Sequence, residues 1–164
     1  MKNTDIQRIC EIFGRMEELL EQYTAIAAVM MKTESEENEL LTEKIAERQK
    51  QVDEISVLRE EASGILDGGD KREAELIRGM LTGGTANEHI PQELIPVRKS
   101  AVNLRSAQIK ASESDRALQL QFESRLQEAK DQLKQLNDEK KKLDYYSSLK
   151  QGGAKLGGSL DGSF

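Results

Sequence analysis

Hydrophobic residues recur every three or four positions along most of this chain, which is the period of an α-helix packed through one face. In the first segment this spacing runs from Ile6 to Met30, and Thr4 with Gln7 fits a capping box just before it. A second hydrophobic stripe widens the apolar face, at Ile12, Leu19 and Ile26. The pattern therefore predicts a first helix that packs against two neighbours.

The periodic pattern lapses over residues 32–37 and resumes from Leu41 to Leu66. Thr33 and Glu36 fit a second capping box, which favours a turn at this point and an antiparallel hairpin of two long helices. One continuous helix from Thr4 to Leu66 is the alternative, because neither glycine nor proline enforces the turn.

A short third helix is expected over Asp70–Leu81, because hydrophobic residues gather on one side of it and Gly83 follows its end. Residues 85–96 form the main irregular connection. Pro91 and Pro96 disfavour helical conformation in the residues before them, and Pro96 suits the first turn of the next helix.

The last helical segment, Val97–Leu149, contains neither glycine nor proline. Hydrophobic residues keep a seven-residue register to Phe122 and resume it after one extra residue, a shift typical of a stutter. Polar residues take seam positions of the two long segments, at Arg48, Gln108 and Asp115. We expect the first half of this helix to pack on the hairpin, and the leucine-rich second half either to stay partly uncovered or to pack within the monomer.

The predicted fold class is all-α, an elongated antiparallel helical bundle or coiled coil. It has two long N-terminal helices, a short third helix and one long C-terminal helix, which form a single domain over residues 1–149. A flexible glycine-rich tail is expected over residues 150–164. The composition agrees, because 33% of the residues are charged and only 4% are aromatic, as is typical of long helices.

Charge, cysteine content and hydropathy indicate the compartment of the protein and the partners that it is not expected to have. The net charge of −6 disfavours nucleic-acid binding, and acidic residues flank the basic run Lys140–Lys142. The single cysteine, Cys10, suits a reducing cytoplasm, where we expect the protein to be. No apolar stretch approaches the ~18 residues that a membrane span needs, so membrane insertion is not expected.

Neither a catalytic nor a metal-binding constellation is visible in the sequence. His89 is the only histidine, and Glu88 is adjacent to it where a di-iron bundle would need a Glu-x-x-His spacing. Gly83 and Gly84 lack the Gly-Lys-Ser/Thr that completes a phosphate loop. We expect a binding protein without enzymatic activity, metal or cofactor.

The helical layout, together with several short elements, resembles the FlgN-type flagellar export chaperones. These elements are Leu41–Ile45 with its Glu43 and Lys44, Tyr145 and Tyr146 near the helix end, and Gly158–Asp161 in the tail. The resemblance implies a cytosolic chaperone for flagellum biogenesis. Such a chaperone keeps hook-filament junction proteins unassembled and delivers them to the type III export gate.

The resemblance also implies two sites on this chain. The client would bind the second half of the last helix and the tail, at Leu126, Leu133, Leu136, Leu143, Leu149, Leu156 and Leu160. Tyr145 or Tyr146 would dock on the export gate. The chain departs from the family in having two tyrosines there, and in having only Asn103 where an asparagine pair is expected.

Helix physics independently agrees with such a site, because a leucine stripe can receive an amphipathic helix of a partner. The same stripe could join two copies in a homodimer, since exposed leucines are costly in water. A self-assembling structural coiled coil is the alternative function. A related secretion chaperone or a stalk-like export component would share this helical style.

Overall fold

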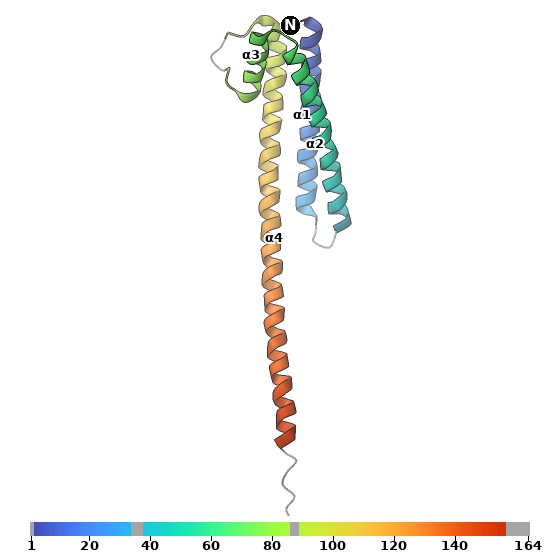
Figure 1. Ribbon diagram of the computed structural model, residues 1–164, viewed down its shortest axis with the longest axis vertical. Coiled ribbons are helices and arrows are strands. Elements are labelled where there is room, and N and C mark those ends of the chain that lie inside the picture. The colour runs from blue at the N-terminus through green and yellow to red at the C-terminus, as the bar shows by residue number, and fades with distance from the viewer. Residues whose placement is uncertain (1, 34–37, 86–88, 157–164) are drawn as a thin grey trace, which may run out of the picture. The chain divides into compact units, whose positions relative to one another are not determined.

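The computed structural model describes residues 2–33, 38–85 and 89–156, with side chains as far as Lys150. These residues form helices α1 (Asn3–Lys32), α2 (Asn38–Asp67), α3 (Lys71–Thr82) and α4 (Ile95–Leu156), and a short 3-10 helix, η1 (Gln92–Leu94) (Figure 1). No strand occurs within the described ranges, so the predicted all-α class is confirmed. The chain divides into two units, unit 1 over residues 1–119 and unit 2 over residues 120–164.

Helices α1 and α2 form the predicted antiparallel hairpin, not one continuous helix (Figure 1). Arg8 Nε donates to Glu61 Oε1 at 2.6 Å, and Arg15 Nη2 donates to Glu54 Oε1 at 2.8 Å. Seven residues further along α1, the partner in α2 lies seven residues earlier in the sequence, as expected for two antiparallel helices. These pairs are exposed to solvent, so they define the register of the hairpin more than its stability.

The capping box predicted at Thr4 and Gln7 is wrong in detail. Helix α1 begins one residue earlier than Thr4, and the backbone N–H of Lys2 donates to the carboxylate of Asp5 at 3.1 Å. An ionised carboxylate is a stronger acceptor than the amide of Gln7, which favours this earlier start. Thr33 follows the end of α1, where its hydroxyl donates to the carbonyl of Val29 at 3.0 Å. Glu36 lies outside the described residues.

The core of unit 1 is built around α1, which packs against two neighbours as the sequence predicted. Its buried side chains are Ile6, Ile9, Ile12, Phe13, Met16, Leu19, Ala27 and Met30. The first half of α4 buries Val97, Ala101, Leu104, Ala107, Ala111 and Leu118. Helix α2 buries only Ile55, Ala62 and Leu66, so it contributes fewer side chains to this core than α1 does.

Two of the polar residues that interrupt the hydrophobic seams meet each other in the structure. The guanidinium group of Arg48 in α2 pairs with the carboxylate of Asp115 in α4 and lies 3.7 Å from the ring centroid of Tyr23 in α1. The Tyr23 hydroxyl donates to Asp115 at 3.0 Å. Burial raises the pKa of the Tyr23 phenol, which keeps it a neutral donor. Together the three side chains fix the register of three helices.

Helix α3 begins and ends one residue later than the predicted Asp70–Leu81, because Asp70 is its N-cap and Gly83 its C-cap. Asp70 accepts hydrogen bonds from the backbone N–H groups of Arg72 and Glu73, at 2.9 and 3.1 Å. Gly83 ends the helix in the left-handed region, with φ of 82°. A Cβ atom at this position would also lie 1.9 Å from the guanidinium of Arg105, so both conformation and space require glycine.

Helix α4 continues to Leu156, beyond Leu149, where the glycine-rich composition predicted its end. Gly152 and Gly153 lie inside it. Each glycine weakens a helix by about 1 kcal/mol relative to alanine, which neighbouring helix-forming residues can offset. The first part of the predicted tail is therefore helical, and its remainder, residues 157–164, lies outside the described residues.

Candidate functional site

Four leucines of α4 form a hydrophobic stripe in unit 2, which we call the leucine stripe: Leu126, Leu133, Leu136 and Leu143. These side chains are between 56% and 67% exposed, whereas Leu104 and Leu118 in unit 1 are at most 5% exposed. The sequence left open whether these leucines are uncovered or packed within the monomer. Among the described residues they are uncovered. Leucines at this spacing form the a/d seam through which a helix meets a partner helix.

Leu149 belongs to a different side of the helix. It follows Leu143 by six residues, which at about 100° per residue places it roughly 120° around the helix axis. It is 53% exposed and lies four residues after Tyr145, on the same side as that tyrosine. Of the other two predicted client-binding residues, the side chain of Leu156 and the whole of Leu160 lie outside the description.

Tyr145 and Tyr146 are both 63% exposed near the C-terminal end of α4. Their rings make an edge-to-face contact, with centroids 6.0 Å apart and an angle of 66° between the ring planes. Large aromatic side chains that are exposed in the free protein are frequent anchors of protein interfaces. The pair is thus accessible for docking, as the resemblance requires.

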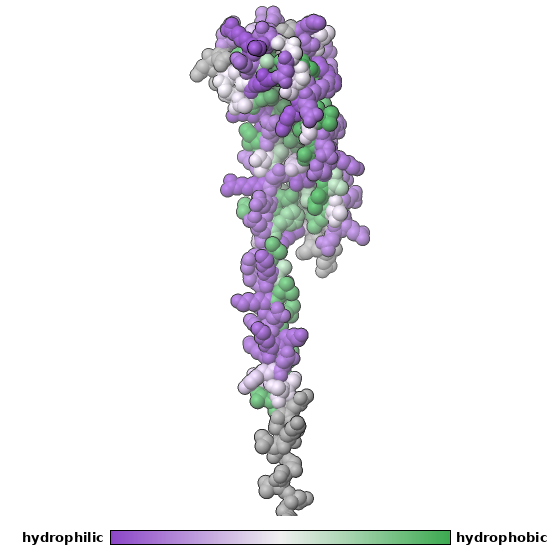
Figure 2. All heavy atoms as spheres, in the orientation of Figure 1, coloured by the Kyte–Doolittle hydropathy of each residue, from purple (hydrophilic) through white to green (hydrophobic). Residues whose placement is uncertain are grey.

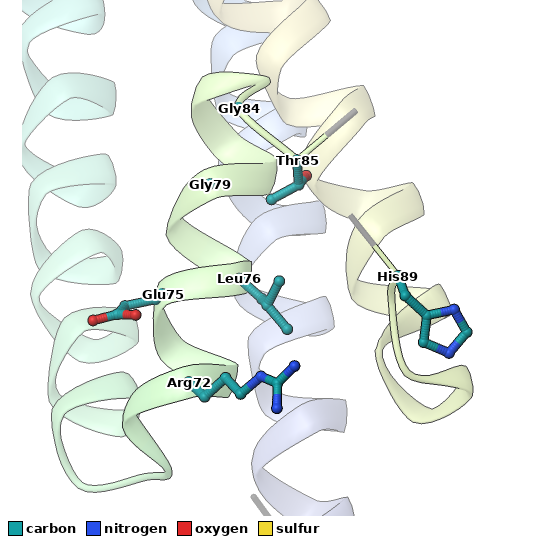
Figure 3. A pocket seen from close by; sticks show the side chains of 7 residues that line it. All are labelled: Arg72, Glu75, Leu76, Gly79, Gly84, Thr85 and His89. Carbon is teal, nitrogen blue, oxygen red and sulfur yellow. The ribbon is translucent and has the colours of Figure 1, made fainter. Parts of the chain in front are cut away.

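A hollow of about 430 Å³ lies between α3 and the segment before η1 (Figure 3). Its lining residues are Arg72, Glu75, Leu76, Gly79, Gly84, Thr85 and His89. The side chain of Glu75 points to the opposite side of α3 from His89, so these two residues do not form an acid–base pair (Figure 3).

Cys10 is half-buried in α1. Desolvation raises the pKa of its thiol, an effect that a hydrogen bond with Ser100 partly opposes. A raised pKa lowers the thiolate fraction at neutral pH, and so the reactivity of the thiol. Within the described ranges, no group of three or more His, Cys, Asp or Glu side chains could hold a metal ion. No helix in these ranges is both long and apolar enough to cross a membrane.

Unit 1 also carries a surface that sequence reasoning missed, a groove between α2 and α4 with α1 as its floor. Two adjoining hollows of about 210 and 310 Å³ form it, and Arg59 and Gln108 line both of them. Figure 2 shows hydrophobic side chains between α2 and α4 on this face. In the sequence, the groove is marked only by small residues at the edges of the hydrophobic seams, which do not predict a groove by themselves: Ser56, Ser63 and Ser112.

Comparison with known proteins does not identify a relative of this chain. No protein-family model, curated protein or solved structure matches it. A proposal for its function therefore rests on the surfaces described above and on the resemblance in layout and short elements.

Proposed function

We propose that this protein is a cytoplasmic flagellar export chaperone that binds hook-filament junction proteins and delivers them to the type III export gate. The observation that carries the proposal is the leucine stripe, which α4 exposes in the described residues. Covering exposed apolar surface contributes about 25 cal/mol per Å². An amphipathic helix of a client, laid along this seam, is therefore the partner that the stripe fits best.

A binding role accounts for the chain better than an enzymatic one. In the hollow beside α3, the side chain of Glu75 points to the opposite side of the helix from His89, and His89 is exposed in a loop. The leucines, in contrast, are spaced for contact with another helix. We therefore assign no catalytic activity, metal or cofactor to the protein.

Affinity capture from the native cell tests this function directly. The intact chain should retain a hook-filament junction protein, and a chain truncated after Leu149 should retain less of it, because it lacks Leu156 and Leu160. Retention of an export ATPase without a junction protein would indicate a related export component. Recovery of the protein alone, with filament growth in light scattering, would contradict the proposal and favour the self-assembling structural coiled coil.

Replacing Tyr145 and Tyr146 together with alanine is expected to spare client binding and to weaken docking on the export gate. Both rings are exposed, and the substitution leaves all four leucines of the stripe in place. Binding of the variant to the cytoplasmic part of the gate and to the client measures the two effects separately. The double phenylalanine variant, which keeps both rings, serves as the control.

If the alanine variant kept both interactions, the two tyrosines would have no role in docking on the export gate. If it lost both, the aromatic pair would belong to the client site, and the division into two sites would be wrong.

A further inference from the structure

Helix α4 carries a second exposed hydrophobic stripe, on its side that faces away from the core of unit 1. Ile95, Val102 and Ile109 follow one another at intervals of seven residues and are between 50% and 55% exposed. At about 100° per residue they lie within roughly 40° of one another, whereas the buried Leu104 lies about 180° from Ile95. These three residues, which we call the outer stripe, belong entirely to unit 1. Their spacing is that of one seam position of a coiled coil.

Basic side chains flank the outer stripe on both sides. Arg98 and Arg105 lie on one side of it, Lys99 and Lys110 lie on the other, and all four are exposed. Within the ranges that the structure describes, none of the four takes part in an ion pair. Their charges are therefore available to a partner.

The charge around the outer stripe is opposite to that of the rest of unit 1. Residues 95–119 contain five Lys and Arg against two Asp and Glu, and one of these two, Asp115, pairs with Arg48. The other, Glu113, lies one turn beyond Ile109. Residues 1–94 contain 11 Lys and Arg against 21 Asp and Glu. A broad anionic surface, such as a membrane, would be repelled by these surroundings, whereas a narrow acidic segment would meet only the basic side chains.

A hollow of about 140 Å³ adjoins the outer stripe between the end of α3 and α4. The guanidinium group of Arg105 lies against Gly83 there, where the C-terminal end of α3 favours a cation. Two guanidinium groups next to the apolar Val102 suit a side chain that has an apolar stem and a carboxylate, as glutamate has. The lining residues are Met80, Gly83, Thr85, Arg98, Val102 and Arg105.

We propose that the outer stripe binds an acidic amphipathic helix of a partner protein. The hydrophobic seam of that helix would contact Ile95, Val102 and Ile109, which span about 21 Å of α4, and its carboxylates would meet the flanking basic residues. Such charge complementarity favours acidic partners and discriminates against basic ones. No residue of the leucine stripe takes part, so the inference stands whatever the client of the leucine stripe is.

Two synthetic helical peptides test the proposal on the full chain. Both have three heptads with isoleucine and leucine in the seam, and the positions that flank the seam hold glutamate in one peptide and glutamine in the other. Fluorescence anisotropy of the labelled peptides measures their affinities. We expect the glutamate peptide to bind at least about tenfold more tightly, although the chain has a net charge of −6, and to lose affinity with added salt.

The double variant Arg98→Glu, Arg105→Glu should lower the affinity for the glutamate peptide about tenfold or more and leave that for the glutamine peptide nearly unchanged. The matched control is Lys134→Glu, Lys141→Glu. These two lysines are exposed in the same helix at the same spacing of seven residues, and the net charge changes equally, but they belong to unit 2. This control should keep its affinity for the glutamate peptide. Circular dichroism confirms that each variant keeps its helix content.

Three outcomes would overturn the proposal. Equal affinities of the two peptides, or no binding of either at about 1 mM, would show that the outer stripe does not select an acidic helix. An equal loss in the Lys134→Glu, Lys141→Glu variant would show that the peptide responds only to net charge. Binding of the chain to vesicles of phosphatidylglycerol and phosphatidylcholine, without binding of the glutamate peptide, would assign the outer stripe to an anionic lipid surface.

Discussion

Leu133→Asp is expected to lower client affinity by about 100-fold or more, with little change in helix content. The side chain is 61% exposed in the free chain, so a carboxylate costs little there. In the complex, loss of a buried leucine contact removes about 1.5–3 kcal/mol, and burial of the new charge adds a desolvation cost. Titration calorimetry with the client measures the loss, and circular dichroism measures the helix content.

Leu120→Asp is the matched control, because Leu120 is 59% exposed in the same helix. It precedes Leu126 by six residues and so lies roughly 120° around the axis from it. Its substitution should leave client affinity unchanged. An unaltered affinity of Leu133→Asp would remove the stripe from the client site. Equal losses in both variants would mean that the charge acts on the helix as a whole.

Periodicity predicted the helices of this protein well because nearly every element is amphipathic or ends at a strong signal. The third helix, with Asp70 before it and the left-handed Gly83 after it, follows local rules. The errors are also local. Competing acceptors lie within one turn at the start of α1, and the pattern alone does not choose between Asp5 and Gln7.

The hydrophobic spacing did not predict which side chains of different helices contact each other. The sequence marked Arg48 and Asp115 as separate interruptions of two seams, yet they form one ion pair across 67 residues of chain. Periodicity specifies which side of a helix is apolar, but it does not specify the register between two helices, that is, which of their residues lie opposite each other. Tyr23, which lies within the hydrophobic spacing of the first segment, joins the pair through its hydroxyl and its ring.

The candidate site was partly predictable for the same reason. The leucine stripe follows from spacing alone, whereas spacing does not determine whether its side chains are exposed or packed within the monomer. Leu149 was assigned to the stripe by its residue type, and helix rotation separates it. The groove between α2 and α4 depends on the distance between two helices that both pack on α1, which hydrophobic patterning does not encode.

Ile9→Ala is expected to destabilise unit 1 by about 2–5 kcal/mol, because the side chain is completely buried and its removal leaves a cavity. Single domains are stable by only about 5–15 kcal/mol, so this loss is a large fraction of the total. Urea denaturation followed by circular dichroism measures it. The variant should still expose its leucine stripe, since Ile9 belongs to α1 and the stripe to α4.

Val57→Ala is the control for this substitution, because it also shortens a β-branched side chain in a helix but at a position that is 64% exposed. Its effect should stay within about 0.5 kcal/mol. Equal effects of the two variants would contradict a core centred on α1. A large effect of Ile9→Ala alone would mean that α1 holds α2 and α4 together, because most of the stability of helices in proteins comes from the packing of their apolar faces.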